Sequence, residues 1–255
     1  MEQPQVTWGQ VDPALLKRIV VLSPHFDDAA MGAGQMLIRY DDAQTTVITV
    51  LGGCPPSYPD PPSDWDTLGG FRSGDDVVAM RREEDRAAME VLGADYVWLE
   101  FADHQYLDPD DRAKPEQVAS VLEEALVAQA PTAVFVPMGL ANPDHVMTHD
   151  AALIVRTRHQ DWAWFAYEDH GYKHIPGMLA WRISKMFRSG LWPTPALVPV
   201  TADTERKRKA IWCYTSQIPP LERDHALTER LDANVPEQFW RLAPPPAGWE
   251  RLIDA

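Results

Sequence analysis

The chain has 255 residues, of which 45% are hydrophobic and 24% charged, so it is long enough to bury a sizeable core within one domain. Its formal net charge of -15 opposes binding to nucleic acid and to acidic lipid, because such partners require clustered Lys and Arg. The two cysteines, Cys54 and Cys213, have no CxxC spacing, which argues against a disulfide framework or a thiolate zinc site and favours a cytoplasmic protein.

The N-terminal residues 1–12 are polar and lack the apolar core of a signal peptide, and no apolar run approaches the ~20 residues that span a bilayer. We therefore expect a soluble protein with no membrane span. Residues 18–23 and 45–51 are short blocks rich in β-branched side chains and predict two buried parallel strands. Residues 30–40 between them have apolar side chains at helical spacings, which completes a β-α-β unit.

Residues 52–74 contain five prolines together with Gly, Ser and Asp, and they predict a long loop at the edge of the sheet where ligands bind. Helices are predicted at residues 77–92, 115–129 and 144–158, and a short apolar block follows each one, at 96–99, 133–136 and 164–167. This alternation predicts an α/β fold with a Rossmann-like, doubly wound, mostly parallel sheet and helices on both faces. We expect a single domain over residues 1–255, in which the part from about 170 to 255 is an extension that shapes the pocket.

A histidine and two consecutive carboxylates follow the first predicted strand. The segment Ser23-Pro-His-Phe-Asp-Asp-Ala29 places His25, Asp27 and Asp28 in a strand-to-helix turn at the ligand-binding edge. Adjacent side chains in such a turn point in different directions, so one carboxylate can bind a metal ion while its neighbour faces a water molecule. A nearby cation also removes the repulsion between the two carboxylates. The alternative is that one Asp only caps the helix, which would explain neither the second Asp nor the histidine.

A second polar cluster, Asn142-Pro-Asp-His-Val-Met-Thr-His149, follows another predicted strand and opens a helix. His145 and His149 are four residues apart and share one helical face, either as two ligands or as a ligand and its supporting partner. Together, His25, an Asp and His145 make the mixed nitrogen and oxygen set that zinc accepts in catalytic sites. For His149 the alternative of a surface histidine near a helix start stays open.

These motifs resemble those of the PIG-L/LmbE-like zinc N-deacetylases, whose first motif is His-x-Asp-Asp and whose second is Pro-Asp-His. Other segments agree in family order, namely Arg81-Arg-Glu-Glu-Asp-Arg-Ala-Ala, Leu92-Gly93, Asp103 after the third strand, Tyr167-Glu-Asp, and Lys209 to Ser216-Gln217. The agreement covers roughly residues 18 to 217, which makes chance a weak explanation. The resemblance implies an amide hydrolase, an N-deacetylase, with Zn2+ as its cofactor.

By position, the resemblance implies that His25, Asp28 and His145 hold the zinc and that Asp27 is the general base that deprotonates the attacking water. It also implies a wider set of site residues. Asn142 and Asp144 are the further catalytic residues, and Arg82, Asp103, His104 and His149 are the substrate-binding residues.

One position departs from the family pattern. Many relatives have a histidine three residues before the last zinc ligand, where it is thought to stabilise the oxyanion, and this chain has Asn142 there. An amide can donate a hydrogen bond to an oxyanion but supplies neither a charge nor a proton. His104 and His149 are the candidates to replace it.

The resemblance implies hydrolysis of the N-acetyl or another N-acyl group of an amino sugar or amino-sugar glycoside, a small-molecule partner. Two alternatives stay open: an amidase that acts on a thiol-sugar conjugate or other amide, and a non-catalytic metal-binding or sugar-binding homologue. Exchange of Asp27 separates these classes, because a binding protein does not need the base. The sequence does not identify the sugar or the acyl group, and it leaves a homo-oligomer open.

Overall fold

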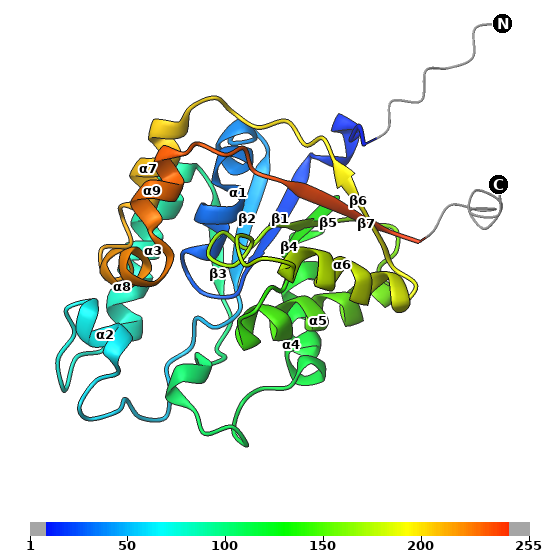
Figure 1. The fold of residues 1–255 in the computed structure, drawn as a ribbon. Coiled ribbons are helices and arrows are strands. Elements are labelled where there is room, and N and C mark those ends of the chain that lie inside the picture. The colour runs from blue at the N-terminus through cyan, green and yellow to red at the C-terminus, as the bar shows by residue number, and fades with distance from the viewer. Residues whose placement is uncertain (1–8, 245–255) are drawn as a thin grey trace, which may run out of the picture.

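The computed structural model describes residues 9–244, and its centre is one sheet of seven strands (Figure 1). The strands are β1 (Arg18–Ser23), β2 (Gln44–Thr49), β3 (Asp95–Trp98), β4 (Ala133–Pro137), β5 (Ala163–Tyr167), β6 (Trp192–Ala196) and β7 (Phe239–Ala243). Their order is β3-β2-β1-β4-β5-β7-β6. The first five strands are parallel, and β7 pairs antiparallel with both β5 and β6. The predicted mostly parallel, doubly wound sheet is therefore confirmed.

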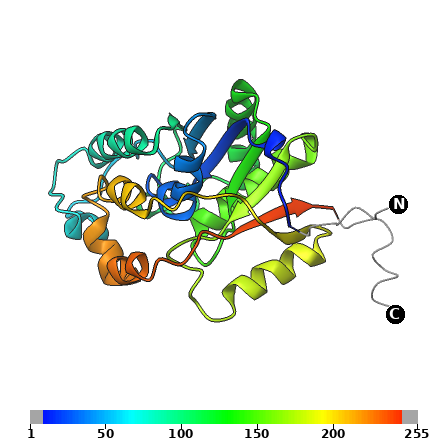
Figure 2. The ribbon, with the colours of Figure 1, turned by 90° about the horizontal axis from the view of Figure 1, so that it is seen from above.

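Helices cover the sheet on both faces. They are α1 (Asp28–Arg39), α2 (Asp64–Leu68), α3 (Val77–Leu92), α4 (Pro115–Gln129), α5 (Pro143–Arg158), α6 (Met178–Arg188), α7 (Thr204–Ile211), α8 (Ile218–His225) and α9 (Leu227–Asp232), with 3-10 helices at Pro13–Leu15 and His104–Tyr106. On one face α7 packs against α1 and α3, and on the other α4 packs against α5. Figure 2 shows that the chain crosses the molecule after α9 to reach β7. Within residues 9–244, no helix is long and apolar enough to cross a bilayer.

Local chemistry explains where the predicted helices begin and end. The carboxylate of Asp76 accepts the backbone N–H of Ala79 at the start of α3, and Gly93 ends this helix with a left-handed φ of 76°. Pro115 occupies the first turn of α4, where no backbone N–H is needed. The predicted ranges 77–92 and 115–129 are therefore those of the structure.

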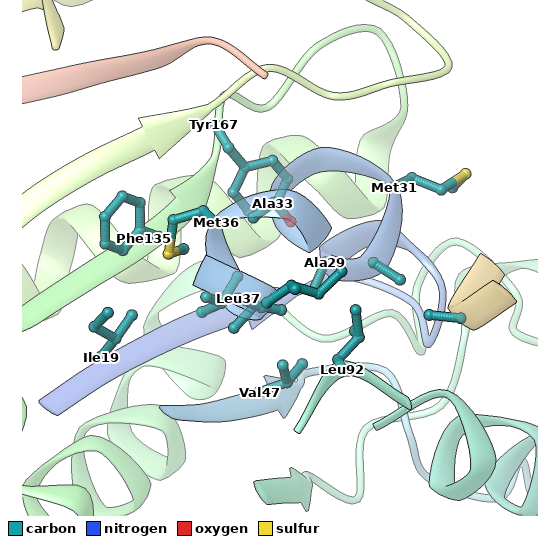
Figure 3. Close-up of a cluster of buried hydrophobic side chains, with 14 of the residues drawn as sticks. Ile19, Ala29, Met31, Ala33, Met36, Leu37, Val47, Leu92, Phe135 and Tyr167 are labelled. Carbon is teal, nitrogen blue, oxygen red and sulfur yellow. The ribbon is translucent and has the colours of Figure 1, made fainter. Parts of the chain in front are cut away.

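A close helix-to-sheet contact is built around Gly32 and Tyr167. Side chains from α1 pack against Ile19, Val47 and Phe135 of the sheet, and Tyr167 lies against the same helix (Figure 3). A Cβ atom on Gly32 would lie 2.4 Å from Cδ2 of Tyr167, so only glycine allows this approach. The Tyr167 hydroxyl donates a hydrogen bond to the carbonyl of Leu22 (2.8 Å) and ties β5 to β1.

Two segments differ from the sequence prediction. The proline-rich loop of residues 52–74 contains the short helix α2, which the hydroxyl of Ser63 caps by accepting the backbone N–H of Asp66. After residue 170 the sequence showed no clear pattern, yet α6 and β6 form there. Pro193 and Pro195 lie within β6, and the sequence does not predict a strand there because proline is rare in strands. They are tolerated because β6 is the edge strand of the sheet.

Candidate active site

The two sequence motifs meet where the strand order reverses. β1 and β4 are neighbours in the sheet although they are far apart in the chain, and ligands bind at such a position beyond the carboxyl ends of the strands. The turn after β1 carries His25, Asp27 and Asp28, and the start of α5 carries Asp144 and His145. All five residues line one pocket of about 410 Å³.

Hydrogen bonds within the turn after β1 fix its shape. The Ser23 hydroxyl donates to the carbonyl of His25 and accepts the backbone N–H of Ala29 (2.9 Å). Oδ2 of Asp28 accepts the backbone N–H of His25 (3.0 Å). These bonds hold His25 and Asp28 side by side at the point where α1 begins.

Asp27 occupies the N-cap position of α1, but its carboxylate makes no capping hydrogen bond. The side chain is buried and lines the pocket. Burial, and then the negative charge of Asp28, raise the pKa of Asp27 to about 7. The capping alternative therefore does not describe Asp27, which is instead a carboxyl group able to exchange a proton near neutral pH.

Three potential metal ligands lie together beside Asp27. One ligand atom each from His25, Asp28 and His145 lies within 4.8 Å of the other two. Oδ2 of Asp28 is 3.2 Å from Nδ1 of His25 and 3.3 Å from Nε2 of His145. A tetrahedral zinc ion with bonds of ~2.0–2.2 Å holds its ligands roughly 3.3–3.6 Å apart, so these residues fit such an ion. Two imidazole nitrogens and a carboxylate oxygen are also a donor set that catalytic zinc uses.

Asp169 orients His145, and the sequence assigned no role to it. Oδ1 of Asp169 is 2.5 Å from Nδ1 of His145, and Oδ2 accepts the backbone N–H of Leu140 (3.0 Å). When Nδ1 carries the proton, the lone pair of Nε2 faces Asp28. Burial lowers the pKa of His145, but the charges of Asp28 and Asp169 outweigh this effect and raise it. The sequence signal for Asp169 was its place in the Tyr167-Glu-Asp segment, which agrees with the family pattern and follows an apolar strand, but that segment did not indicate a role.

Asp144 orients His25 in the same way. Oδ2 of Asp144 is 3.0 Å from Nε2 of His25, and its other oxygen contacts Nδ1 of His104. Burial acts to raise the pKa of Asp144, whereas hydrogen bonds from His104 and His25 lower it, and the net shift is downward. Asp144 is therefore an ionised carboxylate that leaves Nδ1 of His25 directed to the metal-binding set.

A second group, His25, Asp103 and Asp144, also satisfies the distance condition for holding a metal ion. Its geometry is less favourable, because Oδ2 of Asp103 lies 4.0 Å from Nε2 of His25. Both oxygens of Asp103 also accept hydrogen bonds from Gln105, one from its backbone and one from its side chain. The set built on Asp28 is therefore the better metal site.

Asn142, where the family pattern has a histidine, has both ends of its side chain occupied. Its Oδ1 accepts the backbone N–H of Asp144 (2.7 Å) as the N-cap of α5, and its Nδ2 donates to the hydroxyl of Tyr172 (3.0 Å). The ring of Tyr172 packs edge-on against His145. The local role of Asn142 is thus to begin α5 and to hold Tyr172 over the site.

Two of the four residues predicted to bind substrate line the pocket, namely Asp103 and His104. Arg82 does not, because its guanidinium donates to the carbonyl of Gly52 (2.7 Å) and to Glu100 (2.8 Å). Arg81, one residue earlier on α3, lines the pocket in its place. A single helical step turns the side chain by about 100°, which the resemblance did not resolve.

His149 also lies away from the pocket lining. It is fully buried, and its Nδ1 is 2.7 Å from the carbonyl oxygen of Pro137. Burial, and then the charge of Arg182, lower the pKa of His149 to about 3, so the ring stays neutral. The structure therefore separates His149 from both the metal-binding set and the substrate space.

Other residues of the pocket lining lie outside the two motifs that carry the potential metal ligands. Trp65 of α2 and Arg112 before α4 contribute to one part. Residues beyond 170 contribute Tyr172, Leu221 and His225. The rings of Tyr172 and His225 are in contact, with centroids 5.2 Å apart.

A buried carboxylate beside a set of potential metal ligands is the arrangement with which metal-dependent hydrolases activate water, and this is the class of protein that the site indicates. Residues 20–156, more than half of the chain, match the family described as PIG-L: GlcNAc-PI de-N-acetylase. The chain therefore belongs to the PIG-L family, as its motifs predicted, and it is a hydrolytic N-deacetylase.

Solved structures of deacetylases share this fold. The zinc-inhibited form of teicoplanin deacetylase Orf2 is 25% identical, with a TM-score of 0.73 over 91% of this chain and 100% of that chain. The A40926 pseudoaglycone deacetylase Dbv21 is 25% identical, with a TM-score of 0.74 over 91% and 99%. The N,N'-diacetylchitobiose deacetylase from Pyrococcus horikoshii shares the fold at 20% identity, with a TM-score of 0.57 over 89% and 84%. No curated protein sequence matches the chain.

Proposed function

We propose that this protein is a zinc-dependent hydrolase that removes an N-acetyl or other N-acyl group from an amino sugar or an amino-sugar glycoside. The metal ion, when bound by His25, Asp28 and His145, supplies Lewis-acid activation of water and of the amide carbonyl. The substrate class is supported by the teicoplanin and A40926 deacetylases, which have the same fold at 25% identity.

Asp27 carries this proposal. It is buried next to the metal-binding Asp28, it lines the pocket, and its pKa is raised to about 7 by burial and by that neighbour. A base with a pKa near the working pH combines a large ionised fraction with a useful proton affinity. We assign Asp27 the role of taking the proton from the attacking water and of passing a proton to the leaving amine.

His104 is the better candidate for the oxyanion donor that the family pattern places at position 142. Its Nδ1 contacts Asp144, and its Nε2 is buried with no hydrogen-bond partner in the described part of the chain. The ring lines the pocket, whereas His149 does not. An imidazole N–H held by a carboxylate can donate to developing negative charge on the carbonyl oxygen.

The test combines metal content with amine release from N-acetylated amino sugars and their glycosides. We expect about one zinc per chain, as in a catalytic site with three protein ligands. Asp27→Asn should keep the metal and lose about 10²- to 10⁴-fold in kcat, since the amide cannot accept the proton. Asp161→Asn, which changes an exposed aspartate outside the pocket, is the matched control.

Other outcomes would change the assignment. Zinc binding without amine release from any substrate would favour a binding protein, and full activity in Asp27→Asn would remove the base from the reaction. Activity that follows iron or another ion instead of zinc would change the cofactor, because this donor set also suits other divalent transition metals. The cytoplasmic location stays a prediction, supported by the free thiols of Cys54 and Cys213.

A further inference from the structure

Arg112 is a pocket residue whose charge has no partner in the part of the chain that the structure describes. It lies between the 3-10 helix His104–Tyr106 and α4, and it lines the pocket of about 410 Å³ together with that 3-10 helix. Its side chain is half-buried, and its Nε is buried without a hydrogen-bond acceptor among residues 9–244. No described carboxylate lies within 4.0 Å of its guanidinium.

The other arginine of the pocket, Arg81, also has a buried Nε without a hydrogen-bond partner among the described residues, but its terminal nitrogens are paired. Arg81 donates to Asp66 (2.7 Å) and to the hydroxyl of Tyr106 (3.1 Å). Such bonds offset the cost of withdrawing a charge from water, which is large for a group left without a partner. Arg81 is therefore part of the wall, and its charge is already used.

Acidic groups are abundant around Arg112, so its lack of a partner does not reflect a shortage of them. The chain has a net charge of -15, and Asp108, Asp110 and Asp111 are exposed on the same loop. None of these forms an ion pair with Arg112 in the structure. The carboxylates deeper in the pocket face histidines instead, as Asp144 does with His25 and His104.

We propose that Arg112 is a specificity-determining residue that binds an anionic group of the substrate, a carboxylate or a phosphate. This inference rests on the proposed function, because it assumes that the substrate is an acylated amino sugar. It specifies that this sugar also carries a negatively charged group that can reach Arg112 in the pocket wall. A planar guanidinium suits both groups, since it can donate two parallel hydrogen bonds to two oxygen atoms of either. The neutral amide would be held at the metal-binding set while the anion is held by Arg112.

The test measures binding, so that it does not depend on turnover. Zinc-loaded protein carrying Asp27→Asn is titrated with N-acetylglucosamine, with its 6-phosphate, and with the corresponding 6-carboxylate. We expect both charged sugars to bind at least about tenfold more tightly than the neutral one, as a charge-assisted hydrogen bond should provide. A stronger response to only one of them identifies the anion as phosphate or carboxylate.

Substitution of Arg112 then assigns the preference to this side chain. Arg112→Gln should bind all three sugars equally. Arg112→Lys should keep part of the preference, because it keeps the positive charge but cannot donate two parallel hydrogen bonds. Arg188→Gln removes an exposed arginine outside the pocket and should leave the preference unchanged. Unfolding temperatures show that each variant is folded.

Three results would overturn the inference: equal binding of charged and neutral sugars, a preference that survives in Arg112→Gln, and no binding of either charged sugar at millimolar concentration. A failure of the proposed function is distinguishable from these results. It would appear as absence of amine release from every acylated sugar, whereas the anion preference concerns only the ratio of affinities.

Discussion

Replacement of Asp169 by Asn should weaken metal binding although Asp169 is not a ligand. The carboxylate accepts from Nδ1 of His145 at 2.5 Å and from the backbone N–H of Leu140 at 3.0 Å. An amide has one acceptor oxygen, so in either orientation its NH2 group faces one of these two donors. If it faces His145, the ring changes tautomer and the proton moves to Nε2, the atom that faces Asp28.

The expected loss is about ten- to a hundredfold in metal affinity, or roughly 1.4–2.7 kcal/mol, as for other carboxylates that orient a ligand histidine. Competition with a chromophoric chelator measures the dissociation constant of the metal directly. Glu168→Gln is the matched control, because this neighbouring carboxylate accepts from Nε1 of Trp240 and has no contact with His145. A folded Asp169→Asn protein with the affinity of the wild type would refute the assigned role of Asp169.

The remaining predictions concern packing and pH. Gly32→Ala should lower the free energy of unfolding by about 1–3 kcal/mol in urea, because its Cβ would lie 2.4 Å from the ring of Tyr167. Gly34→Ala should cost less, because the nearest atom to its Cβ would be Cγ of Lys207 at the longer distance of 3.1 Å. Burial raises the pKa of Asp85 to about 6 from 3.8, so this group stabilises the fold below pH ~4 and loses that contribution, up to about 3 kcal/mol, as the pH rises through 6. The difference in stability between wild type and Asp85→Asn should therefore change across that window, and a constant difference would contradict it. The value of kcat/KM should fall at acidic pH, because protonation of Asp27 removes the base. The apparent pKa of this fall should be about 7 or lower, because a cation bound at the neighbouring Asp28 lowers the pKa of Asp27.

The first five strands and their helices could be predicted because each carries its signal locally. Strands such as β1 and β4 are buried on both faces and therefore read as continuous apolar runs. The helices between them are marked by caps such as Asp76 and by Gly93. The motif residues also follow from this order, since the carboxyl ends of β1 and β4 must meet where the strand order reverses.

Residues that act through another side chain were harder to find. Asp169 lies 24 positions after His145, and only the pairing of β5 with β4 brings the two together. The choice between Arg81 and Arg82 depended on the rotation of α3 relative to the sheet. Helical periodicity gives the angle between adjacent side chains, about 100°, but it does not say which of the two faces the pocket. The sequence motif does not give the rotation of the helix either.

The part of the chain beyond residue 170 shows why the placement of the motif residues was predictable and that of other pocket-lining residues was not. Tyr172 is held over the site by Asn142 and packs between His145 and His225, so its position depends on two distant elements. Arg112 likewise comes from an irregular loop, where side-chain placement has no repeating pattern. The motif residues of the candidate site follow the ends of β1 and β4, which the sheet fixes, whereas much of the pocket wall sits on loops that can change without disturbing the sheet. Differences in substrate among proteins of this family should therefore be sought in those loops.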